Sequence, residues 1–170
     1  GRILSWGDTT LHLWDINYNP TIELKGHTDY VCGGIELIDG RILSWGDTTL
    51  RLWDRKGSPL TTLNGHIEKI YGATQLHDGR ILSWSDDGIL CLWDNDNRLT
   101  TTLVGHRGGV LKAIELSDGR ILSWGEDGMR LWDKDGVLIS MLEESIWGDK
   151  ECINTWAEKY NILVNVISED

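Results

Sequence analysis

Serine, histidine and aspartate recur together along this chain, in an order that could build hydrolytic sites. Three Gly-His pairs each precede a serine-containing segment and an acidic turn; they are Gly26-His27, Gly65-His66 and Gly105-His106. Such a set could perform nucleophilic catalysis, with histidine taking the serine proton and aspartate orienting the histidine. However, an enzyme normally builds one such site, and the sequence has no Gly-x-Ser-x-Gly elbow. A repeated structural role is therefore favoured, with a Ser-His-Asp hydrolase as the alternative.

The elements that position these residues form an internal repeat. The segment Gly-Arg-Ile-Leu-Ser-Trp begins at Gly1, Gly40, Gly79 and Gly119, which gives spacings of 39, 39 and 40 residues. Each copy leads to a Trp-Asp pair, namely Trp14-Asp15, Trp53-Asp54, Trp93-Asp94 or Trp132-Asp133. Self-similarity at this period indicates a repeat architecture. Residues present in every unit are expected to build the unit.

One unit predicts four short strands. Residues 30–37, 41–45, 50–53 and 59–63 are rich in β-forming residues, and turn residues such as Asp39-Gly40 separate them. Pro59 at the start of the fourth strand fits an outer edge position. An antiparallel meander of this kind has two apolar faces, so it must stack against neighbours. Radial stacking of four-stranded blades predicts an all-β fold, the β-propeller.

At this point the residues resemble a known family, the WD-repeat β-propellers. Gly-His, Asp-Gly, the serine-containing strand and Asp-x-Thr-Leu-Arg-Leu-Trp-Asp (residues 47–54) carry the resemblance. Several of these elements recur in register over residues 1–142, with blades starting near 1, 26, 65 and 105. The resemblance implies a buried tetrad in which histidine binds the second-strand serine, and a turn aspartate and third-strand tryptophan complete the set. Carried over, the tetrads are His27, Ser44, Asp47, Trp53; His66, Ser83, Asp87, Trp93; and His106, Ser123, Asp127, Trp132.

Two units depart from this pattern. The first unit has Ser5, Asp8 and Trp14 but no preceding histidine. The fourth unit offers Glu126 at the register position of Asp47, which leaves its acidic member open between Glu126 and Asp127.

The acidic turns suggest an interaction surface. Asp8, Asp47, Asp86, Asp87, Glu126 and Asp127 are expected to gather on the rim that carries the Gly-His loops. The resemblance implies that this rim docks peptides and partner domains. The net charge of −11 disfavours nucleic acid and anionic membranes, and leaves solubility or a basic protein partner as its purpose. We expect a non-catalytic scaffold that mediates protein-protein interaction through this rim.

The remaining chemistry-bearing residues indicate structure. Eight of the ten tryptophans occupy two fixed repeat positions, which favours packing over a Trp-lined carbohydrate-binding propeller, the second alternative. Trp6, Trp45, Trp84 and Trp124 are expected to pack between blades. Without a His-Glu-x-x-His or Cys/His cluster we expect no metal and no cofactor. Three unpaired cysteines, Cys32, Cys91 and Cys152, are consistent with buried thiols in a reducing compartment, the cytoplasm.

The last part of the chain, residues 143–170, leaves the repeat. Asp149 is a plausible N-cap, and Ile153, Trp156 and Tyr160 fall at the spacing of an amphipathic helix. Residues 162–167 read as a strand. The sequence from Val166 through the C-terminus and on to Ile3 mimics residues 114–121, so this strand is expected to complete the first blade or a seam.

Four units are few for a propeller ring. An open arc would leave two apolar blade faces bare, and a second chain could cover both. We therefore expect a homodimer that forms an eight-bladed ring. A compact four-bladed monomer and a fragment of a longer propeller are the alternatives.

Overall fold

The computed structural model describes residues 3–15, 17, 19–143 and 150–162, which form fifteen strands and one helix. The strands are β1 (Ile3–Gly7), β2 (Thr10–Trp14), β3 (Pro20–Lys25), β4 (Gly33–Glu36), β5 (Ile42–Trp45), β6 (Thr49–Trp53), β7 (Pro59–Asn64), β8 (Ile70–Gln75), β9 (Ile81–Ser85), β10 (Ile89–Trp93), β11 (Leu99–Val104), β12 (Val110–Glu115), β13 (Ile121–Gly125), β14 (Gly128–Trp132) and β15 (Leu138–Glu143). The helix is α1 (Lys150–Lys159).

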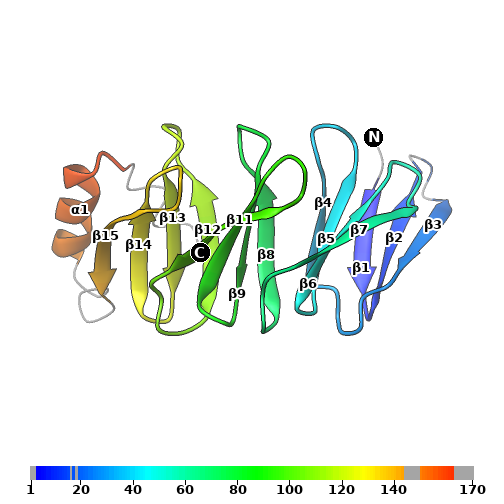
Figure 1. Cartoon of the computed structure of the whole chain (residues 1–170), viewed down its shortest axis with the longest axis horizontal. Coiled ribbons are helices and arrows are strands. Elements are labelled where there is room, and N and C mark those ends of the chain that lie inside the picture. The colour runs from blue at the N-terminus through cyan, green and yellow to red at the C-terminus, as the bar shows by residue number, and fades with distance from the viewer. Residues whose placement is uncertain (1–2, 16, 18, 144–149, 163–170) are drawn as a thin grey trace.

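The strands form four antiparallel sheets in chain order, which we call blades 1 to 4. Blade 1 contains β1-β2-β3, and blades 2, 3 and 4 contain β4 to β7, β8 to β11 and β12 to β15. The blades stand side by side along the molecule, and α1 lies beyond blade 4 at the opposite end from blade 1 (Figure 1). The expected all-β propeller architecture is confirmed. One difference is that, within the described residues, blade 1 has three strands.

Two parts of the tail prediction cannot be placed. Asp149 and, apart from Ile162, the expected strand over residues 162–167 lie outside the described residues.

Two edges of the blades differ in the turns that they carry. One edge has the Asp-Gly turns between the first two strands of blades 2, 3 and 4, and we call it the turn rim. Gly40, Gly79 and Gly119 have φ values of +83°, +90° and +85° there, a region that glycine adopts without a Cβ penalty. The opposite edge has the acidic turns and the Gly-His links between blades, and we call it the loop rim.

Each blade buries one apolar face against the next. The identical Ile-Leu-Ser-Trp segments alternate their side chains between the two faces of a blade. Leu43 and Trp45 of blade 2 therefore pack on blade 3, whereas Ile42 packs on blade 1. Leu43 is 0% exposed and Ile42 is 1% exposed, so both faces of an interior blade are core.

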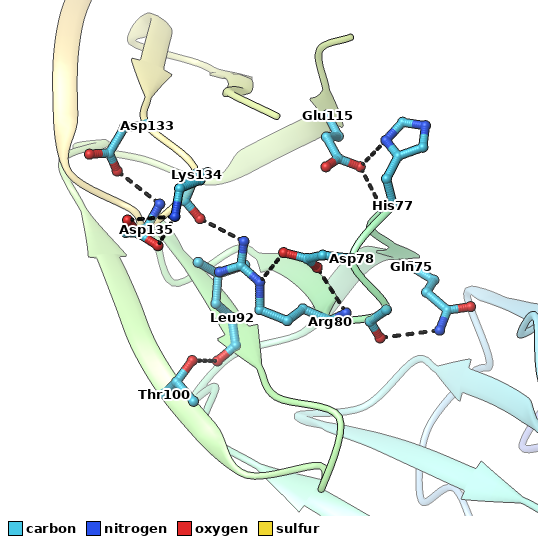
Figure 2. A network of polar contacts seen from close by, with 11 residues as sticks. Gln75, His77, Asp78, Arg80, Leu92, Thr100, Glu115, Asp133, Lys134 and Asp135 are labelled. Carbon is cyan, nitrogen blue, oxygen red and sulfur yellow. Dashed lines mark hydrogen bonds and ion pairs between the residues drawn. The ribbon is translucent and has the colours of Figure 1, made fainter. Parts of the chain in front are cut away.

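Polar contacts at the turn rim fasten one blade to the next (Figure 2). Arg80 of blade 3 donates from Nη2 to the carbonyl of Lys134 in blade 4 at 2.7 Å. In the other direction, Glu115 of blade 4 accepts from the backbone N–H of His77 at 2.8 Å. Blades 2 and 3 make a related pair of contacts. The Ile38 N–H donates to Gln75 Oε1 at 2.9 Å, and Arg41 donates from Nη1 to Asn97 Oδ1 at 3.3 Å. These contacts fix the orientation of neighbouring blades.

The helix α1 covers the outer face of blade 4. Trp156, Ala157 and Ile162 are buried in one cluster with the blade residues Leu116, Leu122, Met129, Leu131 and Leu142. Trp156 also donates from Nε1 to Ser140 Oγ at 3.1 Å. The amphipathic spacing of the sequence therefore corresponds to a helix that closes one end of the stack.

Candidate functional site

The first polar set lies at the loop rim of blade 3 and includes the histidine of the link from blade 2. His66 lies in the link between β7 and β8, and its Nε2 lies 2.9 Å from Ser83 Oγ on β9. Its Nδ1 lies 3.0 Å from Asp87 Oδ2 in the following turn. Trp93 on β10 donates from Nε1 to the same Ser83 oxygen at 2.9 Å. The structure thus brings all four side chains together.

The set of the fourth unit has the same geometry. His106 Nε2 lies 2.8 Å from Ser123 Oγ, and Trp132 donates to that oxygen at 2.8 Å. His106 Nδ1 lies 2.6 Å from Asp127 Oδ1. Glu126 is exposed, so Asp127 holds the histidine in this unit.

The set of the second unit is looser. His27 lies 2.8 Å from Ser44, and Trp53 donates to Ser44 at 2.9 Å. His27 Nδ1 lies 3.2 Å from Asp47 Oδ2, but it is a buried nitrogen without a well-aligned hydrogen bond. Asp47 follows its serine by three residues, whereas Asp87 and Asp127 follow theirs by four. The second and fourth units have nine residues from serine to tryptophan, so the earlier position of Asp47 within its turn accompanies the poorer alignment.

Blade 1 contains part of such a set. Trp14 donates from Nε1 to Ser5 Oγ at 2.8 Å, as the tryptophans of the other units do to their serines. Asp8 is exposed on the loop rim.

These sets have the hydrogen-bond order of a catalytic triad but not its accessibility. Because a carboxylate only accepts, His66 Nδ1 donates to Asp87, which leaves Nε2 to accept from the Ser83 hydroxyl. The serine oxygen simultaneously accepts from Trp93. Ser44, Ser83 and Ser123 are all 0% exposed, so a substrate carbonyl cannot reach them. The arrangement satisfies buried polar groups and locks strands together.

Burial and hydrogen bonding together set the charge states of the histidines and aspartates in these sets. Burial lowers the pKa of His66, and the Asp87 carboxylate only partly opposes this, so the ring is neutral near pH 7. Burial and hydrogen bonding act in opposite directions on Asp127. Burial raises its pKa, but hydrogen bonds from His106 and the Arg107 N–H outweigh that effect and leave the pKa lowered. The pKa of Asp47 is lowered as well, because hydrogen bonds from Thr49 and Thr28 outweigh burial.

One position beside the sets was missed by sequence reasoning. The cross-strand partners of Ser44, Ser83 and Ser123 are Arg51, Cys91 and Arg130. Arg130 is 1% exposed and donates from Nη2 to Asp127 Oδ2 at 2.6 Å. Cys91 is 0% exposed, and burial raises the pKa of its thiol to about 12. Strand alternation was the available signal, because this residue lies between two apolar residues, Leu and Leu or Met and Leu, and shares the face of the tryptophan of the Trp-Asp pair.

The six acids of the expected rim divide into two groups. The side chains of Asp47, Asp87 and Asp127 are only 8%, 1% and 14% exposed, because they bind the histidines and backbone amides beneath the rim. Asp8, Asp86 and Glu126 are exposed. The rim is therefore less acidic at its surface than the sequence suggests, and basic Arg107 and Lys112 are exposed near it.

Two of the exposed acids converge between blades 3 and 4. Asp86 and Glu126 both lie close enough to Tyr71 to influence its ionisation. Burial raises the pKa of Tyr71, and a hydrogen bond with Asp86 and the charges of both carboxylates raise it further. A Cβ on Gly109 would lie 2.6 Å from Asp86 Oδ1, and one on Gly108 would lie 3.0 Å from Glu126 Oε2. We call this set the acidic seam; it comprises Tyr71, Asp86, Gly108, Gly109 and Glu126.

Other candidate sites find less support in the described residues. Trp45 and Trp84 are each 8% exposed and Trp124 is half-buried, whereas Trp6 is 45% exposed, contrary to the expected packing between blades. No group of His, Cys, Asp or Glu in the described residues has the geometry of a metal site. A cavity of about 220 Å³ between the blade 4 turn and the end of α1 is smaller than typical ligand pockets.

The described part of the chain contains no helix with the length and hydropathy needed to cross a membrane.

Comparison with known proteins gives the fold. No family model matches the sequence, and no curated protein matches it. Many solved structures match, among them the crystal structure of the WD40 beta propeller domain of Doa1, with a TM-score of 0.72 and 24% sequence identity. The match covers 84% of this chain and 50% of that one, so this chain spans about half the length of the Doa1 domain. The resemblance to WD-repeat propellers is therefore confirmed at the level of the fold.

Proposed function

We propose that this stack of WD-repeat blades is a non-catalytic scaffold that binds a protein partner at the loop rim. More specifically, the acidic seam receives a Lys- or Arg-bearing segment of that partner. The observation that carries the proposal is the convergence of Asp86 and Glu126 on Tyr71, next to two residues without side chains.

The charges of the seam favour a cation. Asp86 and Glu126 are exposed and are not part of the buried histidine sets, so they can bind a partner without unfolding a blade. Tyr71 and Leu111 are 39% and 53% exposed beside them and add apolar area. A guanidinium or ammonium group between the two carboxylates would form charge-assisted hydrogen bonds. Arg107 and Lys112 nearby would repel a uniformly basic surface, which favours a short segment with one or two cations.

A selection from a displayed library of random peptides tests the proposal. Peptides recovered on the native chain should be enriched in Lys or Arg, and their affinity should fall with added salt. The double variant Asp86→Lys and Glu126→Lys should lose the enrichment and associate more slowly with the peptides.

The matched control is Asp96→Lys with Asp135→Lys. This pair makes the same change of charge on exposed side chains at the turn rim, and it should leave selection unchanged. Enrichment that survives the seam exchange, or that the turn-rim exchange removes equally, would contradict the proposal.

The absence of catalysis is a separate part of the proposal. It rests on the burial of the three serines and on their use as acceptors by tryptophan. A folded Ser83→Ala variant that loses an esterase or peptidase activity present in the native chain would restore the hydrolase alternative.

Assembly and location complete the proposal. In a homodimeric eight-bladed ring, α1 would lie at the seam between blade 4 and the first blade of the other chain. Light scattering should then give the mass of two chains. A mass of one chain that does not change with concentration would contradict the two-chain ring. We place the protein in the cytoplasm, because its three cysteines form no disulfide bond in the described residues. Localisation of a tagged full-length protein would test that.

A further inference from the structure

The link between blades 2 and 3 contains an asparagine followed by a glycine. Asn64 is the last residue of β7, and Gly65 leads directly to His66. Asn64-Gly65 is the only Asn-Gly pair in the sequence. An asparagine in such a pair can react with its own backbone, because the following residue has no side chain to hinder the approach.

The glycine of this pair is required by the fold. A Cβ on Gly65 would lie 2.8 Å from Trp93 Cη2, and one on Gly105 would lie 2.8 Å from Trp132 Cη2. In both blades the tryptophan of the histidine set therefore lies against the glycine of the link. A side chain at Gly65 could not be accommodated without moving Trp93.

The asparagine of the pair is not required by the fold. The residues that end the equivalent strands β3 and β11 are Lys25 and Val104. Asn64 itself is exposed, and it donates from Nδ2 to the Thr62 carbonyl at 3.5 Å. A contact of this length restrains the side chain only weakly.

We propose that Asn64 is a site of spontaneous modification, at which the side chain condenses with the Gly65 amide and is then hydrolysed to aspartate and isoaspartate. The Gly65 nitrogen gives up its proton and attacks Asn64 Cγ, and the Cγ–Nδ2 bond breaks to release ammonia, which takes up that proton through water. Water then opens the cyclic imide. Opening at Cγ gives aspartate in a normal backbone, whereas opening at the backbone carbonyl of residue 64 gives isoaspartate, in which the chain runs through the former side chain. The reaction consumes water, releases ammonia and involves no oxidant or reductant.

The place of Asn64 in β7 allows this reaction in the folded chain. In the part of the chain that the structure describes, β7 is an edge strand that pairs with β6 alone. Asn64 forms the last pair of that ladder, opposite Thr49. The Gly65 nitrogen reaches Asn64 Cγ only when this end of the strand opens. Opening the end of an edge strand costs far less free energy than unfolding the whole chain.

Isoaspartate at this position should loosen the histidine set of blade 3. The link joins Leu63, which is 3% exposed, to His66, which is 7% exposed. His66 lies 2.9 Å from Ser83 Oγ and 3.0 Å from Asp87 Oδ2. An extra carbon atom in the backbone between two buried residues displaces the histidine ring from these partners. Aspartate, in contrast, adds a charge at an exposed position and keeps the backbone length.

Peptide mapping of the full chain, incubated in mildly alkaline buffer, tests the modification. Trypsin releases residues 57–69, whose one asparagine is Asn64, and residues 81–98, which contain Asn95 and Asn97 as internal references. Asn64 should convert at least about tenfold faster than either reference, which corresponds to about 1.4 kcal/mol in the activation free energy. Electron-transfer fragmentation of residues 57–69 should identify both aspartate and isoaspartate.

Urea shows which state of the chain reacts. Below the unfolding transition, conversion through local opening of β7 should proceed at a nearly constant rate. A rate that rises in proportion to the unfolded fraction would place the reaction in the unfolded chain and overturn the proposal.

Matched variants test the consequence for stability. The aged native chain, separated as its isoaspartate form, should melt at least about 3 °C below the fresh chain. Asn64→Val copies Val104 of blade 3, cannot form the imide and should keep its melting temperature on ageing. Fresh Asn64→Asp carries the new charge on a normal backbone and should melt like the fresh native chain.

Three further results would overturn the proposal. Asn64 could convert no faster than Asn95 and Asn97. The isoaspartate form could melt like the fresh chain, or Asn64→Val could lose as much stability on ageing as the native chain.

Discussion

Arg120 donates from Nη2 to the backbone carbonyl of Tyr160 at 2.7 Å, and Arg80 makes the corresponding contact with the carbonyl of Lys134 at the same distance. Lys134 belongs to the loop of a neighbouring blade, whereas Tyr160 follows the end of α1. The helix thus presents to blade 4 the contact that another blade would present. A face that would otherwise be bare and apolar is covered by the chain itself.

Removing the centre of this helical cover should destabilise the stack. Trp156→Ala removes a side chain that is 8% exposed and packs on blade 4, and we expect a loss of about 3–5 kcal/mol in the free energy of unfolding. Urea denaturation measures it. Glu158→Ala, on the exposed side of the same helix, is the control and should change stability by about 0.5 kcal/mol or less. Equal losses would mean that α1 does not pack on the blade.

The histidine sets should be far more sensitive than the rim above them. Trp93→Ala should cost about 3–5 kcal/mol for the buried ring and a further 1–3 kcal/mol, roughly, if the Ser83 oxygen is left without a donor. Asp86→Ala, one residue from the set but exposed, should stay within about 0.5 kcal/mol. Thermal unfolding of the two variants gives the comparison, and equal shifts would refute the assigned set.

Stability should fall as the pH is lowered from 7 toward 5.5. Burial lowers the pKa of His27, His66 and His106 below the ordinary value of 6.5. Below that value the unfolded chain binds more protons than the folded one, so each histidine contributes stability that is lost as the pH decreases. Asp47 and Asp127 act in a separate, more acidic window, because their pKa values are lowered from 3.8.

Urea midpoints across this pH range measure the effect. His66→Gln should reduce the pH dependence, even though it lowers stability at neutral pH. His77→Gln, whose side chain is 82% exposed, makes the same substitution outside the buried sets and is the matched control. A slope that His66→Gln does not alter would show that the buried histidines do not cause it.

The glycines of β4 and β8 that face a tryptophan should tolerate no side chain. Gly33→Ala and Gly72→Ala would place a methyl group against a buried tryptophan ring, and each should cost about 1–3 kcal/mol by overpacking. Gly7→Ala, in β1, is the control because a Cβ there meets nothing within 4 Å. Calorimetric melting of the three variants should separate the first two from the third.

The sequence by itself determined the blades. The spacing of Gly40 and Gly79, the Asp-Gly turns and the strand alternation together predicted the meander, because turn chemistry and hydrophobic period are local properties. The histidine-serine-tryptophan sets were implied by the family resemblance. The acid of the fourth unit could not be chosen from the sequence, since Glu126 and Asp127 are adjacent and only the turn geometry decides which carboxylate faces His106.

Tertiary structure decided which faces and acids are exposed. Asp47 and Asp86 look alike in the sequence, yet Asp47 is drawn inward by Thr28 and Thr49 while Asp86 remains outside. Trp6 and Trp45 occupy identical positions in identical segments, but Trp45 lies against Gly33 of β4 and is 8% exposed, whereas Trp6 is 45% exposed within the described part of the chain. The exposure of a side chain depends on which neighbouring elements pack against it. Identical repeat sequences therefore do not show which copy of a residue is buried.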